Sequence, residues 1–148
     1  MSIRYRRAED LRIALSRGDW ILVKKHLTAG ETRQIYKRMM RQGATGAEID
    51  PLQVGIAKMV AYLKDWSFND PDGQPVIIRQ QSDDFVASAL DNLPVDDFAE
   101  VLDAITVHEK TMETEREEEK KMANGNSRSE AISPLPESLV GATNGSPN

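Results

Sequence analysis

Residues 50–66 read DPLQVGIAKMVAYLKDW and contain the most apolar helix that the sequence predicts. An aspartate followed by a proline is typical of a helix start, because the carboxylate caps free amides and proline loses no hydrogen bond at the first helical position. Apolar residues then recur at helical spacing. We expect this helix to be the central one, with an inner stripe formed by Leu52, Ile56, Met59, Val60 and Leu63.

A second helix is predicted upstream, starting at Thr28. Thr28 and Glu31 have the spacing of a capping box, in which each side chain accepts a hydrogen bond from the backbone amide of the other residue. Gly43 is placed to stop this helix, and residues 43–46 are interpreted as an interhelical turn. They lack the Lys-Ser/Thr that follows a phosphate-binding loop. The apolar stripe of the helix is formed by Ile35, Tyr36, Met39 and Met40.

The residues before this helix predict an N-terminal β-hairpin. Apolar and polar residues roughly alternate over residues 11–15, residues 16–19 have turn chemistry, and residues 20–23 are rich in strand formers. A helix over residues 8–16 is the competing interpretation, since Ala, Leu, Arg and Glu favour it.

A second short hairpin is predicted after the central helix. Asp70, Pro71 and Gly73 suit a type I turn between residues 66–68 and residues 74–78. Pro75 cannot donate a ladder hydrogen bond, so its strand should lie at a sheet edge or begin there.

Two further helices are expected. Ser82-Asp83-Asp84 provides a cap and negative charge at the start of the first, and Asp96-Asp97 begins the second after the break at Pro94. The predicted inner stripe of the first is Phe85, Val86, Ala89, Leu90 and Leu93, and that of the second is Phe98, Val101, Leu102 and Ile105, ending near Met112.

The apolar stripe disappears after Met112. Residues 113–121 are polar on every side, so this part of the helix is expected to project into solvent. Residues 123–148 have no apolar period and are predicted to be disordered. The sequence therefore predicts one mainly helical α+β domain over residues 1–122, with an N-terminal β-hairpin, a second short hairpin and a disordered C-terminal tail.

Composition limits the class of protein. The chain has 148 residues, of which 39% are hydrophobic, no cysteine and a net charge of -5. This indicates a soluble protein of a reducing cytoplasm, without disulfides or thiolate chemistry. The basic N-terminus is not followed by the apolar region of a signal peptide, and no apolar run approaches the roughly 18–20 residues of a membrane helix.

The charge is unevenly distributed. Residues 1–60 hold 12 Lys and Arg against 6 Asp and Glu, whereas residues 61–148 hold 7 against 18. A basic half can indicate nucleic-acid binding, but here the cations are scattered and no basic patch with aromatic residues accompanies them.

No catalytic, cofactor-binding or metal-binding residues are predicted. His26 and His108 lie in separate segments, lack partners at the spacing of a zinc site or triad, and are expected at the surface or its boundary. The pairs at residues 83–84 and 96–97 are interpreted as helix caps. Asp70 and Asp72 are interpreted as turn residues, because the later ligands of a calcium loop are absent.

The order of these elements resembles a known family. The segments concerned are WILV at residues 20–23, LTAGE at 27–31, WSFNDPDGQPV at 66–76 and ALDNLPVDDF at 89–98, followed by a helix that becomes rich in Glu and Lys. This order is similar to the tail assembly chaperones of siphophages, over about residues 10–122.

The resemblance implies a non-enzymatic function in the cytoplasm of a bacterial host. A member of this family binds the tape measure protein, keeps its apolar helical segments soluble and helps tail tube subunits to polymerise. Many members also have a longer form made by ribosomal frameshifting, and residues 124–148 are where such an extension would attach.

An amphipathic helical core that contains methionine can offer an apolar groove to a partner helix. Residues 113–119 are the expected solubilising or docking arm, and a homo-oligomer is compatible with the sequence. Two other hypotheses stay open, a minor virion or connector protein and a small DNA-binding regulator. The candidates for the groove are Ile35, Tyr36, Met39, Met59 and Trp66.

Overall fold

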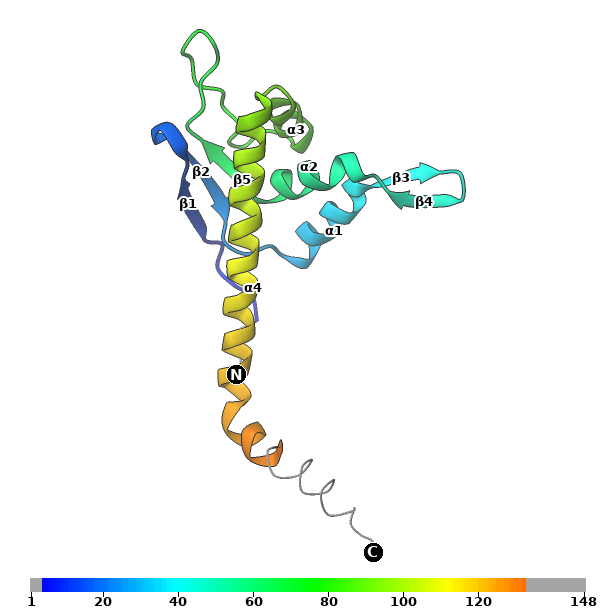
Figure 1. Cartoon of the computed structure of the whole chain (residues 1–148), viewed down its shortest axis with the longest axis vertical. Coiled ribbons are helices and arrows are strands. Elements are labelled where there is room, and N and C mark those ends of the chain that lie inside the picture. Colours follow the sequence, from blue (N-terminus) through cyan, green and yellow to red (C-terminus); the bar gives the residue numbers. More distant parts are fainter. Residues whose placement is uncertain (1–3, 133–148) are drawn as a thin grey trace, which may run out of the picture. The chain divides into compact units, whose positions relative to one another are not determined.

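The computed structural model describes the backbone of residues 4–132 and the side chains of residues 4–124. The chain divides into two compact units, Met1–Glu109 and Lys110–Asn148. The described residues have the predicted α+β fold, shown in Figure 1. Its elements are β1 (Asp10–Ala14), the 3-10 turn η1 (Ser16–Gly18), β2 (Trp20–Lys24), α1 (Ala29–Met39), β3 (Met40–Gly43), β4 (Gly46–Ile49), α2 (Pro51–Tyr62), β5 (Leu63–Trp66), α3 (Asp83–Asp91) and α4 (Val95–Ile132).

The first unit is built on a three-stranded antiparallel sheet in the order β1-β2-β5. Asp10 pairs with Lys24 and Ala14 with Trp20, which confirms the N-terminal hairpin and makes the competing helix over residues 8–16 wrong. The guanidinium of Arg12 lies 4.0 Å above the Trp20 ring, a cation–π contact on this hairpin.

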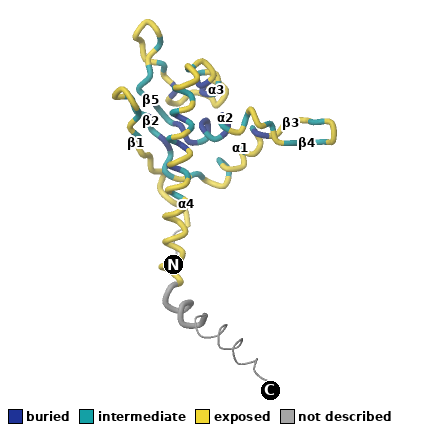
Figure 2. Tube along the Cα trace, viewed as in Figure 1, coloured by how far each residue is buried: buried dark blue, intermediate teal, exposed yellow. Residues whose placement is uncertain are grey.

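The core lies where β2, α2, α3 and the first turns of α4 meet, as the buried segments in Figure 2 show. Ile21 and Val23 alternate inward along β2, while Val101 and Ile105 occupy successive turns of α4. The largest fully buried side chains of the core are those of Ile21, Val23, Met59, Leu90, Val101 and Ile105.

The central helix begins as predicted at Asp50, whose Oδ1 accepts a hydrogen bond from the Leu52 amide at 3.0 Å. Its predicted stripe needs two corrections. Leu52 is exposed, because it lies in the first turn, ahead of the buried positions that begin at Ile56. Leu63 is buried but begins β5, since the helix ends at Tyr62.

The predicted interhelical turn at residues 43–46 is wrong, and a third hairpin occupies this place. α1 ends at Met39 rather than at Gly43, and β3 pairs with β4 from Met40 opposite Ile49 to Gly43 opposite Gly46. The Asp50 amide donates to the Met39 carbonyl at 2.6 Å and closes the base of the hairpin. The hairpin extends away from the ends of α1 and α2 (Figure 1).

The predicted hairpin after the central helix is present as a turn with little strand. The Gly73 amide donates to the Asp70 carbonyl at 2.9 Å, and the Val76 amide to the Phe68 carbonyl at 3.0 Å. A single β-bridge, between Asn69 and Pro75, accompanies them. The residues just before this turn, Leu63–Trp66, form β5. This strand pairs with β2 and completes the three-stranded sheet.

The last two helices start where the sequence predicts. The Ser82 hydroxyl accepts from the Phe85 amide at 3.1 Å at the start of α3. Phe85 itself is exposed, unlike the buried Val86, so it does not belong to the inner stripe. Near the start of α4, hydrogen bonds from the amide and hydroxyl of Ser16 lower the pKa of Glu100 and attach this helix to η1.

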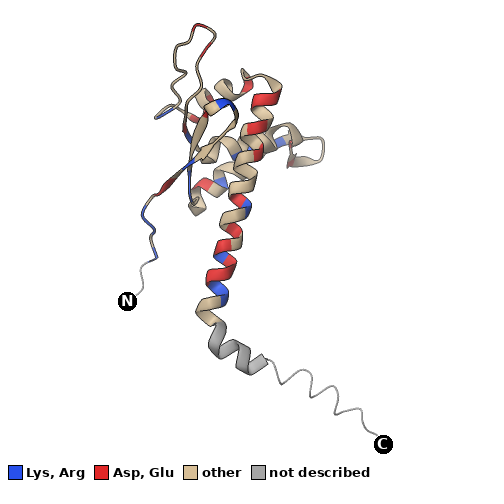
Figure 3. Cartoon of the chain, turned by 60° about the vertical axis from the view of Figure 1, so that its left-hand side comes forward, with Lys and Arg blue, Asp and Glu red and all other residues tan. Residues whose placement is uncertain are grey.

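The second unit contains the remainder of α4. From Lys110 to Asn124 its side chains are exposed except for the half-buried Met112. Acidic and basic residues follow each other along this part of the helix (Figure 3). The helical backbone continues to Ile132, beyond the boundary predicted at residue 122. The predicted disordered tail stays a prediction, since residues 133–148 lie outside the described part of the chain.

Candidate functional site

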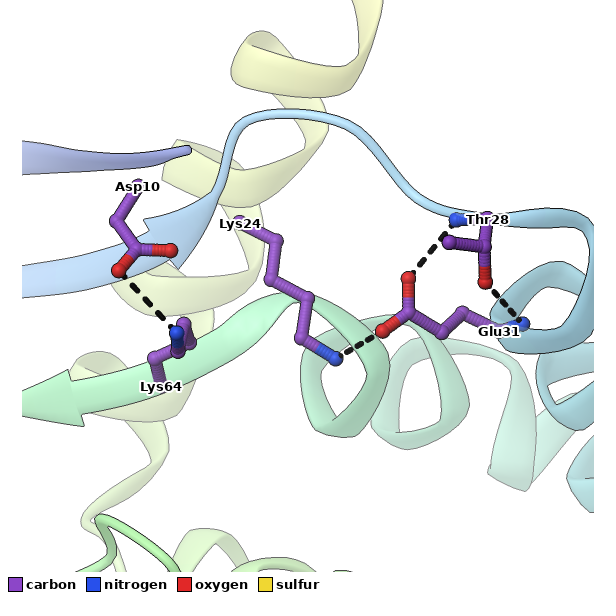
Figure 4. A network of polar contacts seen from close by, with 5 residues as sticks. All are labelled: Asp10, Lys24, Thr28, Glu31 and Lys64. Carbon is purple, nitrogen blue, oxygen red and sulfur yellow. Dashed lines mark hydrogen bonds and ion pairs between the residues drawn. The ribbon is translucent and has the colours of Figure 1, made fainter. Parts of the chain in front are cut away.

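The candidate site is built on α1, whose start is fixed by a polar network. The predicted capping box is present: the Thr28 hydroxyl accepts from the Glu31 amide at 3.1 Å, and the Glu31 carboxylate accepts from the Thr28 amide at 2.8 Å. The same carboxylate accepts from the Lys24 ammonium of β2 at 2.6 Å, as Figure 4 shows. α1 is therefore attached at its first turn to the central strand of the sheet.

This network also sets the pKa of Glu31. Partial burial raises the pKa, but the hydrogen bonds from the Lys24 ammonium and from Thr28, with the charge of Lys24, together bring it below the usual value for glutamate. A second ion pair, Asp10 to Lys64 at 3.2 Å, connects β1 with β5 across β2. Both pairs hold the sheet and the first turn of α1 in one arrangement.

A groove runs between α1 and α2, with a volume of about 350 Å³. Its apolar lining residues are Ile35 from α1 and Ala57, Val60 and Ala61 from α2, of which Ala57 and Val60 are buried. The polar residues that line the remainder of the groove are Gln34, Lys37, Arg38, Gln53 and Asp83.

The charged residues that line the groove are Lys37, Arg38 and Asp83. Arg38 forms an ion pair with Asp84 of α3 at 3.0 Å. Lys37 and, one turn before it, Arg33 are exposed and have no ion-pair partner among the described residues 4–124. Of the two cations that line the groove, Lys37 is therefore the one without an ion-pair partner in that part of the chain.

Exposed apolar side chains lie in the last turn of α1 and on the hairpin that follows it. Tyr36 belongs to α1, whereas Met40 is the first residue of β3 and pairs with Ile49 across the β3–β4 hairpin. Their exposed fractions are 59% for Tyr36, 41% for Met40 and 55% for Ile49. We call these three residues the hairpin patch. Met40 and Ile49 were not among the predicted groove residues.

The five predicted groove residues do not form one groove. Ile35 lines the groove between α1 and α2, whereas Tyr36 lies in the hairpin patch. Met39 is buried below α1, and Met59 is completely buried in the core. Both methionines are buried, so the prediction that they line a groove at the surface is wrong.

Trp66 is also a core residue and lies away from α1. Its indole N–H donates to the Val76 carbonyl at 2.7 Å, and its ring packs against Phe68 at a centroid distance of 4.7 Å. Trp66 also lines a separate cavity of about 750 Å³, together with Leu93, which follows the C-terminal end of α3. Its role is packing, with a small exposed edge.

The histidines behave differently from each other. His26 is exposed, as predicted, and its Nε2 lies 3.2 Å from a guanidinium nitrogen of Arg6. The prediction of a surface position for His108 is wrong, because its side chain is buried and contacts the carbonyl of Lys24 and the ring of Tyr62. A buried histidine with these contacts has a structural role.

Among residues whose side chains are described, no three or more His, Cys, Asp or Glu come together as metal ligands. Within the same part of the chain, every buried side-chain nitrogen or oxygen has a hydrogen-bond partner. No described helix is both long enough and apolar enough to cross a membrane. The surface features described above are the groove between α1 and α2 and the exposed hairpin patch.

Comparison of the chain with protein-family models, with curated proteins and with solved structures gave no match.

Proposed function

We propose that this protein is a non-enzymatic assembly chaperone of a siphophage tail, which binds the tape measure protein in the host cytoplasm and promotes polymerisation of the tail tube. The proposal combines the order of sequence motifs with an exposed apolar surface. In this function the chain keeps apolar helical segments of its partner soluble until the tube covers them.

The hairpin patch is the observation that carries the proposal. Met40 and Ile49 present apolar surface to solvent on the hairpin that extends from the ends of α1 and α2, and Tyr36 does so in the last turn of α1. Contiguous apolar side chains at a protein surface favour contact with another protein. Aromatic and methionine side chains are enriched at such contacts, because they bury much area and adapt to different partners.

The polar part of α4 supports the same function. Residues 113–119 hold five glutamates and one arginine, all exposed. A charged helix of this kind keeps a complex with an apolar partner in solution, because net charge opposes aggregation.

The test is co-expression with a segment of a tape measure protein that is insoluble alone. We expect the full chain to bring this segment into the soluble fraction and to purify with it. The paired substitution Tyr36→Ser and Ile49→Ser should abolish this effect without loss of folding, since both side chains are exposed.

The matched control is Val95→Ser with Ile77→Ser, which removes two exposed apolar side chains outside the hairpin patch. This variant should solubilise the segment as well as the unmodified chain does. Failure of the unmodified chain to bind or solubilise the segment would overturn the proposed function, and equal loss in both variants would remove the hairpin patch from it.

A further inference from the structure

β1 is an edge strand, and one of its two sides has no neighbouring strand among the described residues (Figure 1). On its other side, the Lys25 amide donates to the Glu9 carbonyl at 2.9 Å, and the Leu15 amide donates to the Asp19 carbonyl at 2.7 Å. Hydrogen-bonded and non-hydrogen-bonded pairs alternate along an antiparallel ladder. The odd-numbered residues of 9–15 are therefore the ones whose backbone is bonded to β2.

The even-numbered residues of β1 present their backbone to the open side. By the same alternation, the amides and carbonyls of Asp10, Arg12 and Ala14 point away from β2. No backbone hydrogen bond joins them to another element of the described chain, and all three residues are exposed. A row of free amides and carbonyls along an edge is a template for pairing with a further strand.

The charges along this edge select one way for two copies of β1 to pair. In an antiparallel pair, even-numbered residues must face even-numbered ones, because the backbone of the others is bonded to β2. Registers centred on Leu11, Arg12 or Ile13 each bring at least three residues of the two strands face to face. Centring on Arg12 places like charges opposite each other, and centring on Ile13 places Arg12 opposite Ala14. Centring on Leu11 places Asp10 opposite Arg12 twice, once on each side of the centre.

We infer that β1 pairs antiparallel with β1 of a second copy, in the register that places Leu11 opposite Leu11. The two three-stranded sheets then form one continuous sheet across the contact. Opposite charges that face each other on neighbouring strands stabilise the pairing, whereas like charges oppose it. A dimer of this kind is isologous and closed, since each copy uses the same single edge.

Both charged side chains have free capacity for this contact. Asp10 uses Oδ2 for its ion pair with Lys64, and its Oδ1 has no partner among the described residues (Figure 4). Arg12 stacks on the Trp20 ring and is in no ion pair within residues 4–124. Stacking uses the face of the guanidinium group, so its N–H groups in the plane remain able to donate to a carboxylate.

Leu11 supplies an apolar contact at the centre of the pairing. Its exposed fraction is 40%, although it belongs to a strand of the main sheet. In the inferred register it forms a non-hydrogen-bonded pair with its counterpart, in which side chains approach each other most closely. The dimer thus covers an exposed leucine. This self-association goes beyond the proposed function and uses no residue of the hairpin patch.

Cysteine cross-linking tests the register in the full chain, which has no native cysteine. Leu11→Cys and Ala14→Cys are made as separate variants and oxidised mildly. In the inferred dimer the two Cα atoms of residue 11 lie about 4.5 Å apart, which suits a disulfide, whereas those of residue 14 are about 20 Å apart. We expect Leu11→Cys to form linked dimers at least tenfold faster. Equal rates for the two variants would overturn the inference.

Charge reversal gives an independent readout by sedimentation. Asp10→Lys and Arg12→Glu should each weaken dimerisation at least tenfold, because each places like charges opposite each other. An equimolar mixture of the two variants should dimerise again, since every facing pair is then of opposite sign, and this result also shows that both variants fold. Asp72→Lys and Arg33→Glu make the same charge changes at exposed positions outside β1 and should leave dimerisation unchanged. No restoration in the mixture would overturn the inference.

Amide hydrogen exchange of the unmodified chain locates the contact. An edge contact of this length is small, so we expect the dimer to form at about 0.1 mM. The Arg12 amide should exchange several times more slowly there than in dilute solution, whereas the Ile13 amide, bonded to β2, should not change. A chain that stays monomeric up to about 1 mM would overturn the inference and leave this edge to a strand of another protein. If that monomeric chain still solubilises the tape measure segment, the proposed function stands and this inference alone is refuted.

Discussion

The imidazole Nε2 of His108 lies 3.0 Å from the backbone carbonyl oxygen of Lys24, so the first unit's part of α4 is hydrogen-bonded to the end of β2. A carbonyl oxygen only accepts, so Nε2 carries the proton and donates. The ring also packs edge-on against Tyr62 of α2 at a centroid distance of 5.7 Å. One buried side chain therefore connects a strand with two helices.

His108→Ala is expected to lower the free energy of unfolding by about 2 kcal/mol, because it leaves the Lys24 carbonyl without its donor and opens a small cavity. Urea denaturation monitored by circular dichroism measures the change. His26→Ala, at an exposed histidine, should change the free energy by less than about 0.5 kcal/mol. Equal effects of the two substitutions would show that the hydrogen bond of His108 is not structural.

The lowered pKa of Glu31 predicts a dependence of stability on pH. Because the folded pKa is lower than the unfolded one, the ionised carboxylate stabilises the fold above the unfolded pKa, about 4.3 for glutamate, and this stabilisation is lost as the pH falls through the folded value. Glu31→Gln should thus be less stable than the unmodified chain at neutral pH.

The difference between the two chains should shrink at about pH 3.5, below the pKa of an unfolded glutamate. Denaturant midpoints at the two pH values measure this. The control is Glu113→Gln, which removes a carboxylate from the exposed part of α4. Its difference in stability from the unmodified chain should be the same at both pH values. A constant deficit of the Glu31 variant at both pH values would contradict the assignment of the stabilisation to its charge.

The elements predicted correctly from the sequence are those with strong local signals. The Thr28–Glu31 capping box, Asp50 before Pro51 and Ser82 before two aspartates all mark helix starts that the structure confirms. Each depends on hydrogen bonds within one turn, so the sequence alone specifies it. The same holds for the hairpin of β1 and β2, which has its turn between two strands of matching alternation.

The β3–β4 hairpin had no such signal. Met40 to Gly43 contains no β-branched or aromatic residue, and Met40 continues the apolar stripe of α1, so the helix seemed to extend further. The Asp50 amide that closes the hairpin base comes from outside both strands. Met40 and Ile49 come together only when this hairpin forms. Local sequence patterns therefore could not identify them as a pair in the hairpin patch.

His108 was misplaced although a signal existed. It follows Val101 and Ile105 at the helical intervals that bring side chains onto one face, between Ile105 and Met112. Its polar ring led to the prediction of a surface position. The groove likewise depends on how α1 packs against α2, which no spacing within either helix determines.

Two glycines should respond to alanine with opposite signs. Gly46 begins β4 at φ 115°, which disfavours any side chain, so Gly46→Ala should destabilise the hairpin by about 1 kcal/mol or more. Gly30 lies in the first turn of α1 with room for a methyl group, so Gly30→Ala should stabilise the protein by about 0.4–1 kcal/mol.

Amide hydrogen exchange locates these effects. Faster exchange confined to the paired amides of β3 and β4 is expected for Gly46→Ala, because the hairpin makes few contacts outside itself. Unchanged exchange there would indicate that the hairpin does not need the backbone conformation of Gly46. Gly30→Ala should leave these amides unaffected while raising the denaturation midpoint.

The approach of α2 to α4 depends on the absence of a side chain at Gly55. A β-carbon at this position would lie 3.1 Å from Cδ2 of Leu102, closer than most packed carbon atoms. In Gly55→Ala, the gain in helix propensity, about 1 kcal/mol, is therefore opposed by this close contact. Leu102→Ala alone should cost about 1–3 kcal/mol, since it removes a half-buried side chain from the core margin.

The double variant should be more stable than the sum of the two single effects predicts, because the new methyl group at residue 55 fills part of the space that Leu102 leaves. We expect a coupling free energy of about 0.5–1 kcal/mol in a double-mutant cycle measured by urea denaturation. Gly18→Ala combined with Leu102→Ala serves as the control, since no atom lies within 4 Å of a β-carbon at Gly18. Additive effects at residues 55 and 102 would mean that the helices adjust their separation freely, and Gly55 would then not set the distance between α2 and α4.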